Sequence, residues 1–244
     1  MSNILISTIV RNREKALQEW YNQIKKLVEQ DPDNNYYLSV YENDSTDNSV
    51  EILKSFDYSF LKDSSLKTET LSTKYYGSVI EPERVYNLAK ARNQSIYADD
   101  LVLKKSDFIL CVEPDVTYSP KEALKHVIHL DSYDIISGMS VCSNLLYPPL
   151  YDSWATRKNS QDDAWDMSVP LMGVMPVWST FNCFCMYKAE PFKKNITFDG
   201  FNKRTNKTDC DTTVVCEEFR SHGYDNIYMN CNFKVTHLMD ADLK

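Results

Sequence analysis

The hydrophobic and polar positions along this chain alternate between short apolar runs and amphipathic stretches. Residues 3–10 are largely apolar and β-branched, which predicts a strand buried on both faces. In residues 14–30 apolar side chains recur at the three- and four-residue spacing of an amphipathic helix. Residues 36–41 are expected to form a second strand, and a short helix is expected around residues 50–53. This order predicts an α/β fold with a mixed, mostly parallel sheet flanked by helices.

The same alternation continues to the end of the chain. Residues 57–73 have no clear period and are expected to be irregular strand and loop. A helix is expected from Pro82, because apolar residues there share one face: Val85, Leu88, Ala89, Ala91, Ile96 and Leu101. The later expected elements are strands at 108–112, 134–139, 182–187 and 226–236, and helices at 120–129 and 208–222. We find no repeat and no linker, so a single domain over residues 1–244 is the simplest interpretation.

Two carboxylates follow the expected strand at residues 108–112. Pro114 cannot donate a hydrogen bond to a strand ladder, so the strand should end at Glu113, Pro114 and Asp115. With one residue between them, Glu113 and Asp115 can reach the same side of an extended turn and hold a hard divalent cation beside phosphates. The alternative is a solvated turn without a ligand.

Polar side chains also follow the first two expected strands. Arg11 begins a basic loop after the first strand, and Glu42, Asn43 and Asp44 follow the second strand. In open α/β sheets ligands bind at these carboxyl ends, where an acidic or amide side chain contacts a ribose hydroxyl or a base edge. Turn chemistry with a helix N-cap is the alternative interpretation. A dinucleotide cofactor is disfavoured because no G-x-G-x-x-G motif is present.

Arg92 and Asn93 lie in the middle of the helix expected from Pro82. If this helix packs beside the first two strands, Arg92 can reach a diphosphate and Asn93 can fix the loop after the second strand. On a surface helix both side chains would only be solvated.

Residues 140–180 are poor in periodic runs and rich in aromatic residues, prolines and methionines, including Tyr147, Pro148 and Pro149. Rings such as Trp154 and Trp178, together with polar side chains such as Arg157 and Asn182, suit a sugar-binding cleft. The alternative is a second, smaller core cluster.

The C-terminal elements add further polar candidates. The helix expected at residues 208–222 carries Asp211, Glu217 and Glu218, of which Asp211 and Glu218 share one face. His237 follows the last expected strand and is placed to complete a metal site, although a surface histidine is the alternative.

The amino-acid composition limits the classes of protein to which this chain can belong. The chain has 244 residues and 43% hydrophobic residues, which suffices for a full core. A net charge of -8 argues against binding nucleic acid through phosphate neutralisation. The seven cysteines form no C-x-x-C pair, so buried thiols in a reducing compartment are expected.

The chain shows no signal peptide and no apolar run that would span a membrane, so we expect a soluble, cytoplasmic protein. Two of its four Asn-x-Ser/Thr sequences, at Asn43 and Asn93, fall where a ligand is expected, which also favours the cytosol over a glycosylating lumen.

The order of these motifs resembles glycosyltransferases of the GT-A fold. Residues 42–49, ENDSTDNS, resemble the DDGSTDGT-like segment of that class, and EPD stands where its members carry D-x-D. The chain is more closely similar to the fungal capsule-associated α-1,3-mannosyltransferase family. Four segments carry this likeness: YENDSTDNS (41–49), LAKARNQSI (88–96), LYDSWATRK (150–158) and the C-terminal residues 209–237.

The resemblance implies roles for individual residues. A nucleotide would be held by Arg11, Glu42, Asn43, Arg92 and Asn93. Mn²⁺ or Mg²⁺ would be bound by Glu113, Asp115 and His237. The sugar cleft would be lined by Trp154, Arg157 and Asn182, and Asp211, Glu217 or Glu218 would lie nearest the reaction. Residues 1–119 would then form the nucleotide-binding half and residues 120–244 the sugar and acceptor half.

The activity expected from these features is metal-dependent transfer of mannose or another hexose from a GDP- or UDP-sugar to a hydroxyl of a glycan or glycoprotein. Retention and inversion both stay open. Glu113 replaces the usual first aspartate, which motivates an alternative: an inactive carbohydrate-binding or scaffold protein on the same fold. A nucleotidyltransferase is disfavoured because the loop at residues 11–13 has no glycine.

Overall fold

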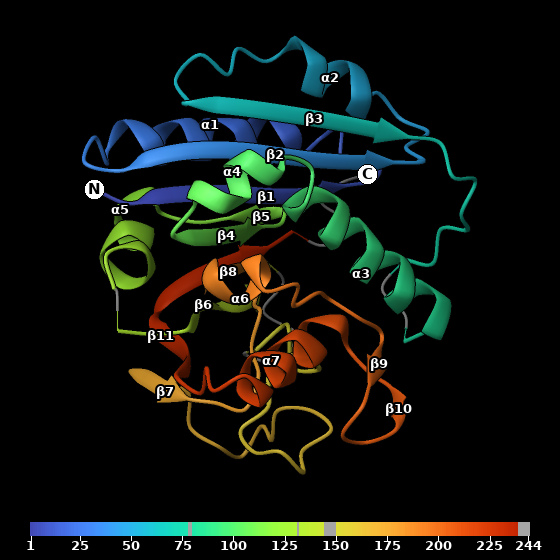
Figure 1. The fold of residues 1–244 in the computed structure, drawn as a ribbon, viewed down its shortest axis with the longest axis vertical. Coiled ribbons are helices and arrows are strands. Elements are labelled where there is room, and N and C mark those ends of the chain that lie inside the picture. Colours follow the sequence, from blue (N-terminus) through green and yellow to red (C-terminus); the bar gives the residue numbers. More distant parts are fainter. Residues whose placement is uncertain (78–79, 131, 144–149, 239–244) are drawn as a thin grey trace.

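A single continuous sheet of nine strands runs through the computed structural model, which describes residues 1–77, 80–130, 132–143 and 150–238 (Figure 1). Its strand order is β3-β2-β1-β4-β8-β6-β11-β5, and β7 pairs with β11. The strands are β1 (Asn3–Val10), β2 (Asn35–Asn43), β3 (Asp63–Glu69), β4 (Phe108–Val112), β5 (Val116–Thr117), β6 (Ile135–Cys142), β7 (Val174–Pro176), β8 (Phe184–Lys188) and β11 (Ile227–His237). A separate hairpin pairs β9 (Phe201–Asn202) with β10 (Lys207–Thr208).

The half of the sheet from β3 to β4 is entirely parallel. β8 then runs antiparallel to both of its neighbours, β4 and β6, while β6 and β11 are parallel to each other. The carboxyl ends of β1, β2 and β4 therefore meet at one edge of the sheet. This geometry brings together the three polar segments that follow these strands in the sequence.

Helices cover both faces of the sheet (Figure 1). One face packs Ile4 and Ile6 of β1 against α1 (Leu17–Glu29), α2 (Ser49–Ser55), α5 (Pro120–Ala123) and the π-helical turn Leu124–Ile128. The opposite face packs Leu5 of β1 against α3 (Pro82–Ile96), α4 (Asp100–Lys105), α6 (Glu190–Lys193) and α7 (Asp211–Ser221). Successive residues of β1 thus serve two cores, which explains why its sequence is largely apolar. The predicted α/β fold with a mixed, mostly parallel sheet is confirmed.

The helix predicted to start at Pro82 is shorter than expected. It ends at Ile96, and a separate helix α4 starts after Asp99, whose side chain accepts hydrogen bonds from the backbone N–H groups of Leu101 and Val102. The prediction that Leu101 lies on the buried face was therefore wrong, because this N-cap turns Leu101 outward and leaves it 74% exposed.

Two other segments also differ from the expectation. Residues 57–73 contain a regular strand, β3, which the pattern did not reveal because it is an edge strand with mostly polar side chains. In the segment 140–180, Leu150, Ala155 and Trp165 are buried in the core beside α7 and do not form a separate cluster. Tyr147, Pro148 and Pro149 lie outside the described residues.

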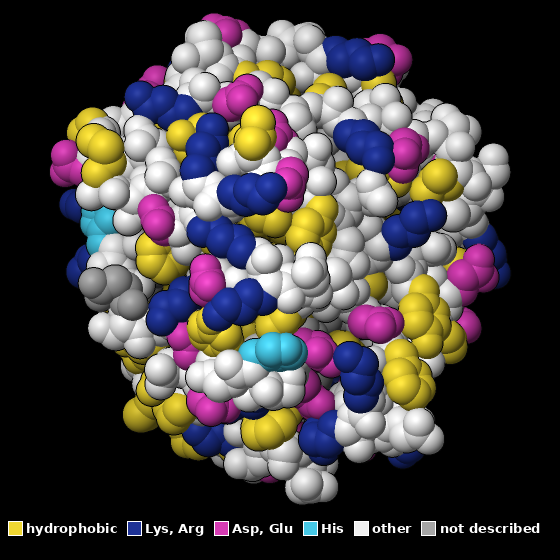
Figure 2. Space-filling view, viewed as in Figure 1, with side chains coloured by type: hydrophobic (Ala, Val, Ile, Leu, Met, Phe, Trp, Pro, Cys, Tyr) yellow, Lys and Arg dark blue, Asp and Glu magenta, His cyan; other side chains and the backbone are white. Residues whose placement is uncertain are grey.

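All seven cysteines are free thiols, and six of them are buried, as expected. Within the described ranges no helix is both long enough and apolar enough to cross a bilayer. On the face seen in Figure 2, basic and acidic side chains are interspersed and form no field of one sign. The cytoplasmic location stays a prediction.

Gly138 offers a test of how tightly β6 packs. A Cβ at this buried position would lie 2.6 Å from Cδ1 of Phe233 and 2.9 Å from Cγ2 of Val235. We expect Gly138→Ala to lower the free energy of unfolding by about 1–3 kcal/mol through overpacking. Urea unfolding measures this loss, and Phe233→Leu in the same chain should recover part of it. A Gly138→Ala protein as stable as the parent would contradict the packing described.

Candidate active site

Two adjoining cavities form one cleft at the carboxyl edge of the parallel strands. The first has a volume of about 150 Å³ and lies between the ends of β1 and β2, residues 74–77 and the first half of α3. The second has a volume of about 370 Å³ and is lined by residues 151–154, the start of α7 and the end of β11. Both cavities share five residues: Arg13, Arg84, Leu88, Glu113 and Asp115. The acidic pair thus stands at the junction of the cleft.

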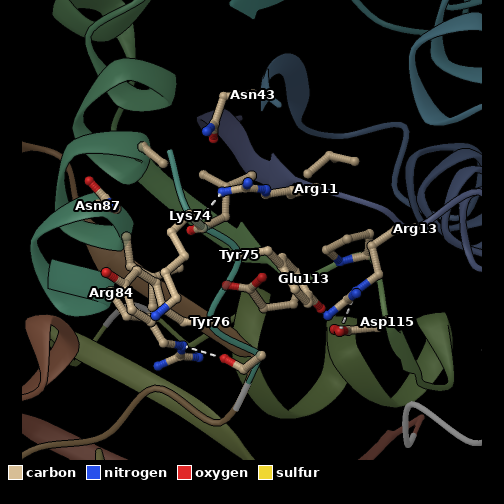
Figure 3. A pocket seen from close by; sticks show the side chains of 16 residues that line it. Arg11, Arg13, Asn43, Lys74, Tyr75, Tyr76, Arg84, Asn87, Glu113 and Asp115 are labelled. Carbon is tan, nitrogen blue, oxygen red and sulfur yellow. Dashed lines mark hydrogen bonds and ion pairs between the residues drawn. The ribbon is translucent and has the colours of Figure 1, made fainter. Parts of the chain in front are cut away.

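The first cavity combines basic, aromatic and amide side chains (Figure 3). Its basic residues are Arg11, Arg13, Lys74 and Arg84. Tyr75 and Tyr76 supply rings, and Asn43 and Asn87 supply amides. Such a lining suits an anionic ligand that carries a planar ring.

Asp44 and Arg11 hold in place residues 71–73, which precede the cavity-lining residues 74–77. The Asp44 carboxylate accepts hydrogen bonds from the backbone N–H groups of Leu71, Ser72 and Thr73 and from the Thr73 hydroxyl. Burial acts to raise the pKa of Asp44, but these hydrogen bonds hold it well below its usual value. Arg11 donates to the Thr73 carbonyl at 2.6 Å and lies over the Tyr75 ring.

The predicted nucleotide-binding residues at the ends of β1 and β2 therefore lie in different places. Asn43 and Arg11 line the first cavity. Asp44 instead organises the loop at residues 71–73, and Glu42 accepts a hydrogen bond from the backbone N–H of Ser45 at 2.8 Å. Both carboxylates bind the protein's own backbone, so we give them a positioning role.

At the junction, Asp115 is almost fully buried and faces two basic groups. The Arg13 Nε donates to its Oδ2 at 2.8 Å, and Nε2 of His237 lies 3.6 Å from the same oxygen. The His237 ring in turn stacks on Tyr151, with 3.9 Å between the ring centroids. The structure thus brings Asp115 and His237 together although 122 positions separate them in the sequence.

Arg92 occupies the space between Glu113 and Asp211. Its Nη1 donates to Glu113 Oε1 at 2.6 Å, and its Nε donates to Asp211 Oδ2 at 2.9 Å. The rings of Phe181 and Phe198 enclose the guanidinium, with centroids 4.2 and 5.8 Å from its central carbon. Burial acts to lower the pKa of Arg92, but the two carboxylates hold it well above its ordinary value. Burial raises the pKa of Glu113 even though Arg92 lies against it.

Asn93 is the neighbour of Arg92 but does not reach the loop after β2. Its amide donates to the Phe198 carbonyl and accepts from the Phe198 N–H, each at 2.9 Å. The expectation that it fixes the loop after the second strand was wrong. Asn93 instead anchors the chain that precedes β9.

Of the three residues predicted to bind a metal, Glu113, Asp115 and His237, the structure brings two side chains together, those of Asp115 and His237. No group of three or more His, Cys, Asp or Glu side chains forms a metal cage in the part of the chain that the structure describes. Asp115 and His237 fit two ligands of one ion, since ligand atoms about 2.1 Å from a metal lie about 3–4 Å apart. The Glu113 carboxylate instead pairs with Arg92 at 2.6 Å and forms no described cluster with Asp115 and His237.

The four predicted sugar-binding residues lie in different places. Trp154 lines the second cavity. Arg157 is buried and binds the Asp209 carboxylate with both Nη atoms. Trp178 donates through Nε1 to Glu217 at 3.0 Å and lies between Arg204 and Arg220. Asn182 is fully buried in a polar network.

Of the three carboxylates predicted nearest to the reaction, only Asp211 lines the second cavity. Glu217 is bound by Arg204 and Trp178, and Glu218 is bound by Lys203. Glu217 and Glu218 line neither of the two cavities.

Sequence reasoning missed several residues of the cleft. Asp152 lines the second cavity and lies within YDSWATR, the segment that carried the most specific resemblance. Burial raises the pKa of Asp152 to about 6. The other missed side chains are Lys74, Tyr75, Tyr76, Arg84 and Asn87. Apart from their basic and aromatic character, residues 74–77 carry no signal in the sequence that would have placed them there.

Three solved glycosyltransferase structures have a similar fold. Residues 1–349 of S. aureus TarS match with a TM-score of 0.57 and 16% identity, over 99% of this chain and 62% of that one. PcManGT from Pyrobaculum calidifontis, a mannosyltransferase solved with GDP-Man and Mn²⁺, matches with a TM-score of 0.59 and 12% identity, over 97% and 56% of the chains. GalNAc-T7, solved with UDP, GalNAc and Mn²⁺, matches with a TM-score of 0.59 and 12% identity, over 98% and 44%. The chain therefore has the GT-A fold of glycosyltransferases.

The sequence itself identifies the family within this class. Residues 3–218 match the family described as Cryptococcal mannosyltransferase 1, and the chain belongs to that family. The predicted resemblance to fungal mannosyltransferases is thereby confirmed. No curated protein matches the sequence. The chain spans about 60% or less of the length of the three solved structures named above.

The position of Arg157 yields a stability prediction. Arg157→Met would leave the buried Asp209 carboxylate without its guanidinium partner, so we expect a loss of about 3–5 kcal/mol in the free energy of unfolding. The pKa of Asp209 is lowered in the native protein, since Arg157 and Asn202 outweigh the effect of burial. The pair therefore stabilises the fold at neutral pH, and the difference between the two proteins should narrow as the pH falls below about 4.

Urea unfolding at pH 7 and at about pH 3 measures both effects. Lys203→Met is the matched control, because it removes an exposed cation from Glu218 and should cost less than about 1 kcal/mol. Equal losses for the two variants would show that the Arg157–Asp209 pair is not the buried interaction described.

Proposed function

We propose that this protein transfers a sugar from a nucleoside diphosphate sugar to a hydroxyl of a glycan or glycoprotein. One observation carries the proposal: an acidic junction, Glu113 and Asp115, stands between a basic, aromatic cavity and a carboxylate-lined cavity. The two ends of such a donor match the two cavities. The nucleotide is anionic and carries a planar base, whereas the reacting sugar is neutral and carries hydroxyl groups.

The first cavity is the proposed site of the nucleotide and its diphosphate. Arg11, Arg13, Lys74 and Arg84 would neutralise the phosphates, while Tyr75 and Tyr76 would offer rings to the base. Structural neighbours were solved with UDP, with UDP-GlcNAc and with GDP-Man, which supports a nucleotide-sugar donor. The sugar is proposed to be mannose or another hexose, in keeping with the family.

A divalent cation, Mn²⁺ or Mg²⁺, is proposed to be held by Asp115 and His237 together with the phosphates of the donor. The ion would supply positive charge to the departing diphosphate, so that no strong protein acid is needed. PcManGT and GalNAc-T7 were both solved with Mn²⁺. Within the chain, Arg13 orients Asp115, and Tyr151 orients the His237 ring.

The second cavity is the proposed site of the transferred sugar and of the acceptor. Trp154 and Phe181 offer apolar surface to a sugar ring, and Asp152 and Asp211 offer hydrogen-bond acceptors to hydroxyl groups. The nucleotide half at residues 1–119 and the acceptor half at residues 120–244 both line this cavity, through α3 and residues 151–154.

An inactive, carbohydrate-binding role is the second candidate. The observation that favours it is the ion pair between Glu113 and Arg92, which withdraws the first acid of the acid-x-acid motif from a metal. Such a protein would bind glycans without a metal-dependent affinity for nucleotides.

The test is a thermal-shift series with UDP, GDP, CMP and dTDP, each with Mn²⁺, Mg²⁺ or EDTA. A nucleotide at 100 times its dissociation constant adds about 2.7 kcal/mol, which corresponds to a rise of about 5–10 °C for a chain of this size. We expect one nucleotide to give this rise with metal and to lose most of it with EDTA. Asp115→Asn should abolish the part that depends on metal.

Asp33→Asn is the control, because it makes the same chemical change at an exposed position. If no nucleotide stabilises the protein while a glycan does, the inactive role is the correct one. If a nucleotide stabilises the protein equally with metal and with EDTA, the proposed nucleotide site is supported and the proposed role of the metal is refuted.

A further inference from the structure

Asp152 differs from the other carboxylates of the second cavity in what surrounds it. Glu113 and Asp211 both bind the Arg92 guanidinium, and Asp115 binds Arg13. Among the described residues Asp152 takes part in no ion pair, and its Oδ2 accepts a hydrogen bond from the backbone N–H of Asn182 at 2.8 Å. Its carboxylate is therefore not engaged by a guanidinium group, whereas those of the neighbouring acids are.

A buried polar network fixes this carboxylate in place. Asn182 is fully buried with φ of 55°, and its Oδ1 accepts from the Ser140 hydroxyl at 2.8 Å. The Ser140 Oγ accepts from the backbone N–H of Asp152 at 3.1 Å, so the chain on both sides of the carboxylate is held. The Asn182 amide also donates to the hydroxyl groups of Thr156 and Thr180. A network this well satisfied gives Asp152 a rigid, preorganised position.

The charged groups that face Asp152 come from three other elements. Arg92 of α3 attracts its negative charge, while Glu113 after β4 and Asp211 of α7 repel it. Burial is the largest influence, and together with the two acids it raises the pKa of Asp152 to about 6. The side chain is therefore ionised at neutral pH and protonated below pH 6.

The location of Asp152 separates it from the diphosphate. Glu113 and Asp115 line both cavities, whereas Asp152 lines only the second. Asp152 and Asp211, the two carboxylates that line the second cavity and not the first, disfavour a phosphate there but favour a neutral hydrogen-bond donor. The attacking hydroxyl of an acceptor is such a donor.

We propose that Asp152 is the catalytic residue that receives the acceptor: its free carboxylate oxygen accepts the hydrogen bond of the attacking hydroxyl and takes its proton. The hydroxyl oxygen bonds to the sugar carbon as the bond from this carbon to the diphosphate oxygen breaks, and the nucleoside diphosphate leaves. Asn182 and Ser140 are positioning residues for Asp152. This inference rests on the proposed function, because it assigns the acceptor side of the same site. It also assigns a role to the aspartate of YDSWATR that the resemblance did not supply.

The experiment uses Asp152→Asn, which keeps the shape of the side chain and still accepts the hydrogen bond from Asn182. The probes are GDP-mannose and UDP-glucose with water as the acceptor, and the readout is release of nucleoside diphosphate. We expect the rate to fall about 10²–10⁴-fold while the thermal shift by the nucleotide stays that of the parent. The rate of the parent should fall about tenfold per pH unit below pH 6, since a protonated Asp152 cannot take the proton of the attacking hydroxyl.

Asp163→Asn is the matched control, because Asp163 is exposed on the same segment and should leave the rate unchanged. Ser140→Ala should lower the rate and move the acid limb of the pH profile without weakening nucleotide binding. If Asp152→Asn retains the parent's rate, or if the parent binds a donor without releasing diphosphate, this inference is overturned and the donor site stands. If no nucleotide binds, the proposed function fails first, and this inference fails with it.

Discussion

The buried guanidinium of Arg92 is the interaction on which the rest of the site depends. It joins Glu113, at the end of the parallel half of the sheet, to Asp211, at the start of α7. Without this cation, two carboxylates would be buried side by side, and both burial and mutual repulsion would oppose their ionisation. The rings of Phe181 and Phe198 exclude water from the cation, so its charge acts in a medium that screens little. One side chain of α3 thus sets the position of the second half of the cleft relative to the first.

This arrangement divides the carboxylates of the cleft among separate tasks in the proposed reaction. Glu113 and Asp211 hold the architecture through Arg92, Asp115 faces His237 at the junction, and Asp152 stands alone on the acceptor side. The division follows from the partners of each carboxylate: Arg92 holds both Glu113 and Asp211, whereas Asp115 faces His237 as well as Arg13. Asp152 takes part in no ion pair among the described residues, so its carboxylate is available to a substrate. The cleft would therefore bind an anionic donor at one end and a neutral hydroxyl at the other.

The sequence predicted the features that neighbouring residues determine. It did not predict the contacts between residues that lie far apart along the chain. The strands, the parallel order and the acid-x-acid junction follow from apolar runs and from the residues that end them, and Asp115, Arg11 and Asn43 lie in the cleft as expected. Arg157 lies in the segment YDSWATR and Asn182 at an expected strand, yet their partners, Asp209 and Ser140, lie 52 and 42 residues away along the chain. No spacing rule reveals such pairs. The residues 74–77 were missed because the loop is shaped by Asp44, which reads in the sequence as ordinary turn chemistry.

The central claim is that a metal and a diphosphate meet at the junction of the two cavities. The most direct measurement is the anomalous scattering of Mn²⁺ in crystals grown with the nucleoside diphosphate that binds. The account predicts one strong peak within bonding distance of Asp115 and His237, with the phosphates on the side of Arg11 and Lys74. A diphosphate held by the basic side chains with no peak at Asp115, or a peak centred on Glu113, would contradict it.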